Sequence, residues 1–200
     1  MTEDSIRNAR HTDRMARKKA LIDAHIAEAN IDTGILVVLT GNGKGKSSSA
    51  FGMVARAIGH GMKVGVVQFI KSRTDTGEEA FLGKHCEWHV MGDGFTWDTQ
   101  DREADTRKSE QAWEVAHRML ADPSYELVVL DELTYCLSYS YLDRSRVITD
   151  LESRPAMQHV VVTGRAAAKE LLDIADTVSV IENEKHAYTS GIRAQKGVEW

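Results

Sequence analysis

Eight consecutive residues have the types and spacing of a loop that binds phosphate: Thr40-Gly41-Asn42-Gly43-Lys44-Gly45-Lys46-Ser47. The apolar residues 35–39 precede this loop, and a segment with helical periodicity begins near Ser48. Strand, glycine-rich loop and helix in this order are the context that a P-loop requires. The glycines allow backbone N–H groups to turn inward, and together with the helix N-terminus these groups form a concave anion site.

Two side chains of the loop are expected to act on the phosphates. Lys46 would reach the outer phosphates as a point charge, and the Ser47 hydroxyl would bind a magnesium ion that bridges phosphate oxygens. The loop departs from the usual pattern at Thr40, where a glycine is expected, and it carries an additional lysine at Lys44. A glycine-rich turn before an ordinary helix is the alternative interpretation.

A second stretch, Leu127-Val128-Val129-Leu130-Asp131-Glu132, is an apolar run that ends in two adjacent carboxylates. In a parallel sheet such a strand would bring Asp131 and Glu132 to the carboxyl edge, beside the phosphate-binding loop. Carboxylate oxygens at that place would hold Mg²⁺ directly or through water. The alternative is a strand that merely ends in a solvated acidic turn.

A third stretch, residues 92–99, contains two large aromatic side chains, Phe95 and Trp97, among residues typical of a loop. Gly92 and Gly94 mark this loop. Aromatic rings in a loop either anchor it to the core or line a ligand site. Composition alone favours anchoring.

The rest of the chain alternates apolar strands with amphipathic helices, which predicts a parallel sheet with helices on both faces. Residues 71–84 are expected to form a loop with one short helical turn, and the tail from residue 183 a loop closed by Trp200. Strands are expected at residues 35–39, 64–69, 87–91, 127–130, 159–163 and 177–181, and helices at residues 48–59, 104–120, 143–153 and 166–175.

Length and composition indicate a globular protein with one sizeable core. The net charge is −5, so no overall basic field favours nucleic acid as a partner. No apolar run approaches the ~20 residues of a membrane span, and the first residues lack the apolar core of a signal peptide. We therefore expect a cytoplasmic protein that binds neither nucleic acid nor a membrane. Cys86 and Cys136 lack metal-ligand spacing and are expected to be reduced, buried thiols.

The N-terminal 33 residues differ from the rest in charge. Residues 5–20 carry six basic side chains against one acidic side chain, and a helix-compatible pattern continues to Asn30. We expect residues 1–33 to form an exposed N-terminal helical extension of a domain that spans residues 34–200. The helix is either a solvated extension or a cap over an anionic ligand or a partner subunit.

Taken as a whole, the sequence resembles the P-loop type of ATP:corrinoid adenosyltransferase, a family that acts on cob(I)alamin or cob(I)yrinic acid a,c-diamide. The resemblance covers nearly the whole chain, and Ser47-Ser48 stands where the family commonly has Thr-Thr, which keeps a hydroxyl for the metal. It is carried by residues 40–47, Lys63-Val64-Gly65-Val66-Val67-Gln68-Phe69-Ile70-Lys71, Gly94-Phe95-Thr96-Trp97-Asp98-Thr99, Leu130-Asp131-Glu132-Leu133-Thr134-Tyr135, Val162-Thr163-Gly164-Arg165 and Ala194-Gln195-Lys196-Gly197-Val198-Glu199-Trp200.

This resemblance implies an α/β fold, a single P-loop NTPase (RecA-like) domain in which helices flank a mostly parallel β-sheet. It also implies transfer of the adenosyl group of ATP rather than of a phosphoryl group. The Co(I) centre of the corrinoid attacks the 5′ carbon of the ribose, and triphosphate leaves. The residues implied to bind ATP are Gly41, Asn42, Gly43, Lys44, Gly45, Lys46, Ser47 and Ser48.

The loop would then stabilise a leaving group. Backbone N–H groups, Lys44, Lys46 and Mg²⁺ or Mn²⁺ would balance the charge that grows on the departing triphosphate, which gives Lys46 a catalytic role. Ser47 and Glu132 match the family's metal ligands. Asp131 is expected to contact these ligands without binding the metal itself.

The resemblance also assigns the two aromatic rings. Phe95 and Trp97 match the family's aromatic pair beneath the corrin, which displaces the lower axial ligand and makes Co(II) easier to reduce. This implication favours ligand contact over anchoring. The resemblance further implies an electron donor, expected to be a flavoprotein, and a homodimer in which the N-terminal helix helps to cover an active site.

Two other functions fit parts of the sequence. A P-loop ATPase or phosphotransferase would use Glu132 to orient a water molecule and would release ADP and phosphate instead of triphosphate. A RecA-like nucleic-acid ATPase would need a basic stripe, which the chain lacks outside residues 5–20.

Overall fold

The computed structural model describes residues 3–73, 75–92 and 101–200, and its contacts divide the chain into two units, Met1–Asp32 and Thr33–Trp200. The first unit contains a single helix of 26 residues, α1 (Glu3–Glu28), and every side chain described in it is exposed. Even the apolar side chains of Leu21 and Ile26 are each 65% exposed. The described side chains of this unit therefore form no core.

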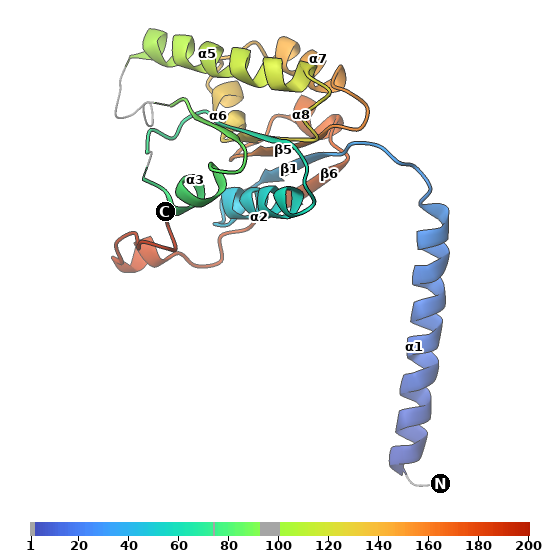
Figure 1. Cartoon of the computed structure of the whole chain (residues 1–200). Helices are drawn as coiled ribbons and strands as arrows, with labels where there is room; N and C mark the ends of the chain where they lie inside the picture. Colours follow the sequence, from blue (N-terminus) through green and yellow to red (C-terminus); the bar gives the residue numbers. More distant parts are fainter. Residues whose placement is uncertain (1–2, 74, 93–100) are drawn as a thin grey trace. The chain divides into compact units, whose positions relative to one another are not determined.

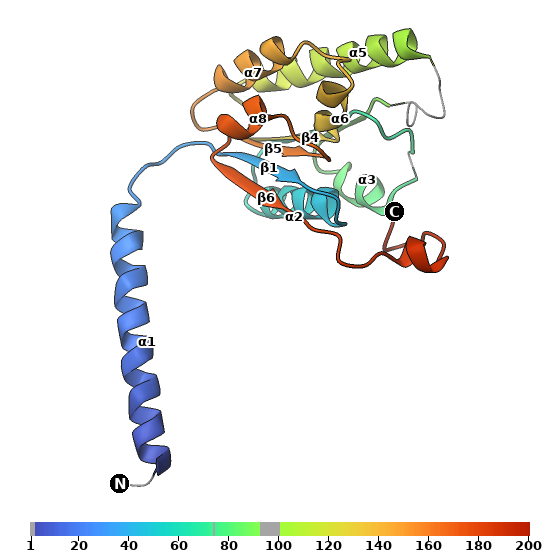
Figure 2. The same ribbon diagram turned by 180° about the vertical axis from the view of Figure 1, so that it is seen from behind.

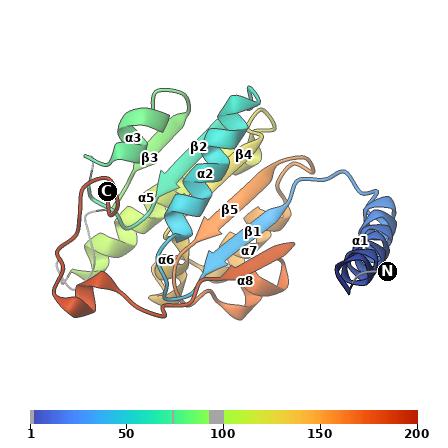
Figure 3. The same ribbon diagram turned by 90° about the horizontal axis from the view of Figure 1, so that it is seen from below.

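The second unit is built on a six-stranded sheet in the order β3-β2-β4-β5-β1-β6, in which every strand pairing is parallel (Figure 3). The α/β fold with a parallel sheet predicted from the sequence is confirmed. The strands are β1 (Leu36–Thr40), β2 (Val64–Gln68), β3 (Glu87–Val90), β4 (Leu127–Asp131), β5 (His159–Thr163) and β6 (Thr177–Val180).

Helices cover both faces of this sheet (Figures 1 and 2). Two of them, α2 and α3, lie on one face, and four, α5 to α8, lie on the other. The bounds are α2 (Lys46–Gly59), α3 (Gly77–Leu82), α5 (Arg102–Ala121), α6 (Leu133–Ser138), α7 (Arg144–Glu152) and α8 (Lys169–Asp173), with a short 3-10 helix η1 (Ala187–Ser190) after the last strand.

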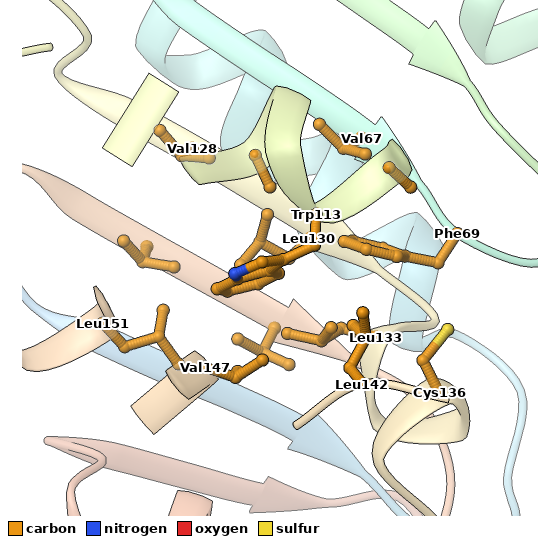
Figure 4. Close-up of a cluster of buried hydrophobic side chains, with 14 of the residues drawn as sticks. Val67, Phe69, Trp113, Val128, Leu130, Leu133, Cys136, Leu142, Val147 and Leu151 are labelled. Carbon is orange, nitrogen blue, oxygen red and sulfur yellow. The ribbon is translucent and has the colours of Figure 1, made fainter. Parts of the chain in front are cut away.

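Alternation along each strand divides the core into two layers. In β1, Val37 and Leu39 pack with α2, whereas Leu36 and Val38 pack on the opposite side with α5 to α8. Trp113 of α5 is 1% exposed and fills the centre of the second layer (Figure 4). Burial of each large apolar side chain contributes about 1.5–3 kcal/mol, so these two layers hold the carboxyl ends of the strands in place.

In the second half of the chain, the bounds of one predicted helix were wrong and another helix was not predicted. The helix expected at residues 166–175 is only α8 (Lys169–Asp173), because Ala166 has φ 48°, in the left-handed region that a right-handed helix excludes. The sequence analysis also missed α6, which begins directly after Glu132. Among the described residues, none of the helices is both long and apolar enough to cross a membrane.

Candidate active site

Each of the four central strands ends in a buried polar residue. Thr40 ends β1, Gln68 ends β2, Asp131 ends β4 and Thr163 ends β5, and all four are at most 7% exposed. Because the strands are parallel, these ends share one edge of the sheet, and the strand register sets Gln68 opposite Asp131. The predicted phosphate loop leaves the same edge from β1. The fold therefore gathers polar groups where the sequence analysis placed the site.

The loop at residues 41–45 makes the turn that its glycines predict. Gly45 has φ 111°, a conformation that a residue with a side chain rarely adopts, and α2 begins at the next residue. Gly43 packs against the chain after β6: its N–H donates to the Ile181 carbonyl at 2.7 Å, and a Cβ there would lie 2.3 Å from the Glu182 carbonyl oxygen. The first N–H groups of α2 have no intrahelical acceptors, so they are available to an anion.

Lys46 is folded over this loop. The residue is 7% exposed, and its ammonium donates to the Gly43 carbonyl at 2.7 Å. Burial lowers the pKa of Lys46, and the charges of Glu132 and Asp131 act in the opposite direction. A partly desolvated ammonium held by one carbonyl can exchange that weak partner for a phosphate oxygen at little cost.

Asp131 has both of its oxygens engaged by protein donors. Its Oδ1 accepts from the Thr163 hydroxyl at 2.7 Å, and its Oδ2 accepts from Gln68 Nε2 at 2.9 Å. Lys71 Nζ also lies 2.9 Å from Oδ2. Burial alone would raise the pKa of Asp131, but Lys71 and the hydrogen bonds from Gln68 and Thr163 hold it below the ordinary value. Asp131 is therefore an ionised carboxylate whose partners are other side chains.

Glu132 has the opposite environment, although it is the next residue. Its backbone has φ 63°, and its N–H donates to Thr163 Oγ1 at 3.0 Å. Among the described residues, no hydrogen bond or ion pair reaches its carboxylate. Burial and the charge of Asp131 raise the pKa of Glu132, although the charges of Lys71, Lys46 and Arg165 act in the opposite direction. Gly164 lies beside this carboxylate, where a Cβ would be 2.1 Å from Thr134 Oγ1 and 3.3 Å from Glu132 Oε2.

The donor set fits a hard divalent cation. The Ser47 hydroxyl and the Glu132 carboxylate are oxygen ligands of the kind that Mg²⁺ and Mn²⁺ prefer. Among the described residues, no three His, Cys, Asp or Glu side chains gather in one place. A cation here would thus have few protein ligands and would take the others from phosphate and water, as Mg²⁺ commonly does.

Three residues of the site were not selected by the sequence analysis: Gln68, Lys71 and Thr163. Gln68 and Thr163 could have been identified from the sequence, because each is a polar residue at the end of an apolar strand. Lys71 belongs to a stretch that carries the family resemblance, but the sequence analysis assigned it no role, since its contact with Asp131 depends on β2 lying beside β4 in the sheet.

The C-terminal residues return to the loop. Glu199 pairs with Lys44, and the guanidinium of Arg73 lies 4.1 Å from the centre of the Trp200 ring. The lysine expected to bind triphosphate is thus paired with a carboxylate in the structure.

Phe95 and Trp97 lie outside the described residues. The chain on their N-terminal side runs close to the site: Met91 N–H donates to the Gln68 carbonyl at 2.9 Å, and a Cβ on Gly92 would lie 2.1 Å from the Ile70 carbonyl carbon. Gly92 is therefore a position where two backbones approach too closely for a side chain.

The two cysteines take no part in the site. Both are free thiols; Cys136 is buried and Cys86 is half-buried. Burial raises the pKa of Cys86 to about 11 and that of Cys136 to about 12, so both remain protonated near neutral pH. The prediction of a buried thiol therefore holds for Cys136 but not fully for Cys86.

A glycine loop between β1 and α2, with acidic residues at the end of a nearby parallel strand, defines a P-loop nucleotide-binding protein. Residues 32–200 match the family described as ATP:corrinoid adenosyltransferase BtuR/CobO/CobP, and residues 1–26 match one described as Cob(I)alamin adenosyltransferase N terminal. The chain therefore belongs to the ATP:corrinoid adenosyltransferase family, as its resemblance implied.

Individual relatives are similar over almost their whole length. The chain is 58% identical to a corrinoid adenosyltransferase of Pseudomonas aeruginosa, with 100% of both proteins covered. It is 49% identical to the corrinoid adenosyltransferase CobA of Salmonella typhimurium, across 96% of this chain and 98% of that protein. It is 48% identical to a corrinoid adenosyltransferase of Escherichia coli K12 over the same shares.

Proposed function

We propose that this chain transfers the 5′-deoxyadenosyl group of ATP to the Co(I) centre of a corrinoid and releases triphosphate. Cobalt supplies both electrons of the new cobalt–carbon bond. The bond between C5′ and its oxygen breaks, and its electron pair leaves with the triphosphate. Membership of the family over residues 32–200 is the observation that carries this proposal, and it does not favour the ATPase or nucleic-acid alternatives.

The loop supports triphosphate as a leaving group. The N–H groups at the start of α2 and the Lys46 ammonium, which lies against the loop, would stabilise the negative charge that grows on the triphosphate. No proton has to be removed from the nucleophile, because the nucleophile is a metal centre. The reaction therefore needs no general base, and the site can consist of anion-binding groups alone.

We place Mg²⁺ or Mn²⁺ on the Ser47 hydroxyl and the Glu132 carboxylate. The open carboxylate of Glu132 and the raised pKa that its surroundings give it support this assignment. The bound ion would supply positive charge to the phosphate oxygens. Ser47 and Glu132 would orient it, while Thr163 holds the backbone of Glu132 in position.

We assign Phe95 and Trp97 to the corrin. Their proposed role is to exclude the lower axial ligand of cobalt, so that a weak reductant can convert Co(II) to Co(I). An external electron donor, expected to be a flavoprotein, would supply the electron. The position of Gly92 beside Ile70, close to the site edge, is consistent with this role.

The remaining expectations concern assembly and location. We propose that residues 34–200 form the adenosyltransferase domain and residues 1–33 its helical extension. The enzyme would be a cytoplasmic homodimer, with the basic N-terminal helix helping to cover an active site. The exposed apolar side chains of α1 support a role in covering another surface.

Product analysis tests the reaction. The protein is incubated without oxygen with ATP, Mg²⁺ and chemically reduced cob(I)alamin, and the phosphate products are separated. Adenosyl transfer requires one triphosphate for each adenosylated corrinoid. Release of ADP and phosphate with no change in the corrinoid spectrum would identify an ordinary P-loop ATPase instead.

A further inference from the structure

Lys71 lies where the two strand ends and the phosphate loop meet. Its ammonium is 2.9 Å from Asp131 Oδ2 at the end of β4 and donates to Ser47 Oγ, 3.3 Å away, in the first turn of α2. The same ammonium is 5.4 Å from the centre of the Phe51 ring, also on α2. One positive charge thus connects the loop after β2, the end of β4 and the start of α2.

These two contacts are those that a metal ion makes in other P-loop proteins, where Mg²⁺ is held by the P-loop Ser or Thr and by an Asp at the end of a neighbouring strand. Here an ammonium group connects the corresponding side chains, Ser47 and Asp131. We propose that Lys71 is a metal-positioning residue: its ammonium replaces the metal at Asp131 and confines the divalent cation to Ser47 and Glu132. This inference rests on the proposed metal site, but its test measures metal binding alone.

Counting lone pairs supports the exclusion of metal from Asp131. A carboxylate offers about four acceptor positions on two oxygens. Oδ2 already accepts from Gln68 and Lys71, and Oδ1 accepts from Thr163. The residue is 0% exposed, so the fourth position is not open to solvent. Asp131 therefore offers no solvent-accessible oxygen to a hydrated cation.

Electrostatics acts in the same direction. The Lys71 ammonium neutralises Asp131 and repels a second cation brought to the same oxygen. The charge of Lys71 also acts on Glu132, but no ion pair or hydrogen bond from the described residues reaches the Glu132 carboxylate, so its oxygens stay open to a metal. The negative charge that is available to a metal is therefore the charge of Glu132, and the ammonium beside it selects that carboxylate.

A substitution that removes only the charge tests this role. Lys71→Met keeps an unbranched side chain of similar length, and Asp131 retains its hydrogen bonds from Gln68 and Thr163. Mn²⁺ is titrated into the nucleotide-free protein, and free Mn²⁺ is read from its electron paramagnetic resonance signal. We expect Lys71→Met to bind Mn²⁺ about tenfold more tightly than the wild type, because Asp131 becomes a free ligand in addition to Ser47 and Glu132.

Two matched variants control this result. Lys71→Arg keeps the positive charge and is expected to stay within about twofold of the wild-type affinity. Lys71→Met with Asp131→Asn removes the new ligand and should abolish the gain. Wild-type affinity in Lys71→Met, or a gain that persists in the double variant, would overturn the proposal. A merely structural role for Lys71 would produce no gain in affinity.

If Lys71→Met alone fails to fold, the double variant still tests whether Asp131 binds the metal in the wild type. The double variant removes both charges, so it leaves no unpaired ion in the core. With ATP present, it should bind Mn²⁺ within about twofold of the wild type, whereas Glu132→Gln should lose about tenfold. A loss in the double variant as large as that in Glu132→Gln would show that Asp131 is a ligand and would refute the inference. Failure of the adenosyl-transfer assay would leave these binding results unchanged, so the two proposals fail separately.

Discussion

The Thr163 hydroxyl is the most informative single group to remove. It donates to Asp131 Oδ1 at 2.7 Å and accepts from the Glu132 N–H at 3.0 Å, and the residue is 0% exposed. Thr163→Val replaces the hydroxyl by a methyl group of similar volume. A lost hydrogen bond to a charged group costs about 1.5–3 kcal/mol, and a buried unsatisfied N–H costs about 1–3 kcal/mol. We therefore expect a total loss of about 4 kcal/mol in the free energy of unfolding.

For a protein of this size, 1 kcal/mol corresponds to about 2–4 °C in Tm, so Thr163→Val should lower Tm by about 10 °C. Because Glu132 loses the partner that fixes its backbone, Mn²⁺ affinity should fall by about tenfold as well. Calorimetry and Mn²⁺ titration measure the two effects, and Thr163→Ser, which keeps the hydroxyl, is the control. A Thr163→Val protein with wild-type Tm and wild-type metal affinity would refute this reading of the site.

Three further predictions concern separate parts of the chain. Lys46→Ala should lower kcat/KM for ATP by about 10²–10³-fold, because it removes one group that stabilises the leaving triphosphate, and should leave the circular dichroism spectrum unchanged. Trp97→Ala should impair turnover from Co(II) more than turnover from chemically reduced Co(I). Glu87→Gln should lower the free energy of unfolding at pH 7 by about 1 kcal/mol, after allowance for solvent screening. Burial alone would raise the pKa of Glu87, but Tyr125, His89 and Arg118 lower it from 4.5 to about 2. This stability is present above about pH 4.5 and is lost as the pH falls toward 2, so the variant and the wild type should converge there in urea unfolding.

Each of these predictions has an outcome that contradicts it. Normal turnover in Lys46→Ala would contradict the proposal that this loop binds the phosphates of ATP. Equal losses of activity in the Co(II) and Co(I) assays would indicate that Trp97 only packs against its neighbours. A constant difference in stability between the wild type and Glu87→Gln across the acid range would show that the ionisation of Glu87 is not the cause.

The sequence predicted the central strands because each is a continuous run of β-branched and aliphatic residues. The phosphate loop was predicted for a similar reason, since its spacing is local. The helix α6 was missed because six residues form less than two turns and show no reliable period. Its start also depends on the left-handed backbone of Glu132, which propensity does not predict for this residue.

The contact between Lys71 and Asp131 shows the limit of sequence reasoning most clearly. These residues are 60 positions apart, and they meet only because β2 pairs with β4 in the sheet. The sequence predicts a parallel sheet but not the order of its strands. The residue types alone leave Asp131 and Glu132 equivalent as candidate metal ligands. The family resemblance favoured Glu132, and in the fold the two carboxylates have different partners.

Isotope transfer tests the central claim most directly. ATP labelled with ¹³C at the 5′ carbon is incubated with the enzyme and a Co(I) corrinoid, and the products are examined by NMR. We predict that the labelled carbon becomes bonded to cobalt and that one triphosphate is released for each labelled corrinoid. Labelled carbon found only in ATP and ADP, with the corrinoid unmodified, would contradict adenosyl transfer.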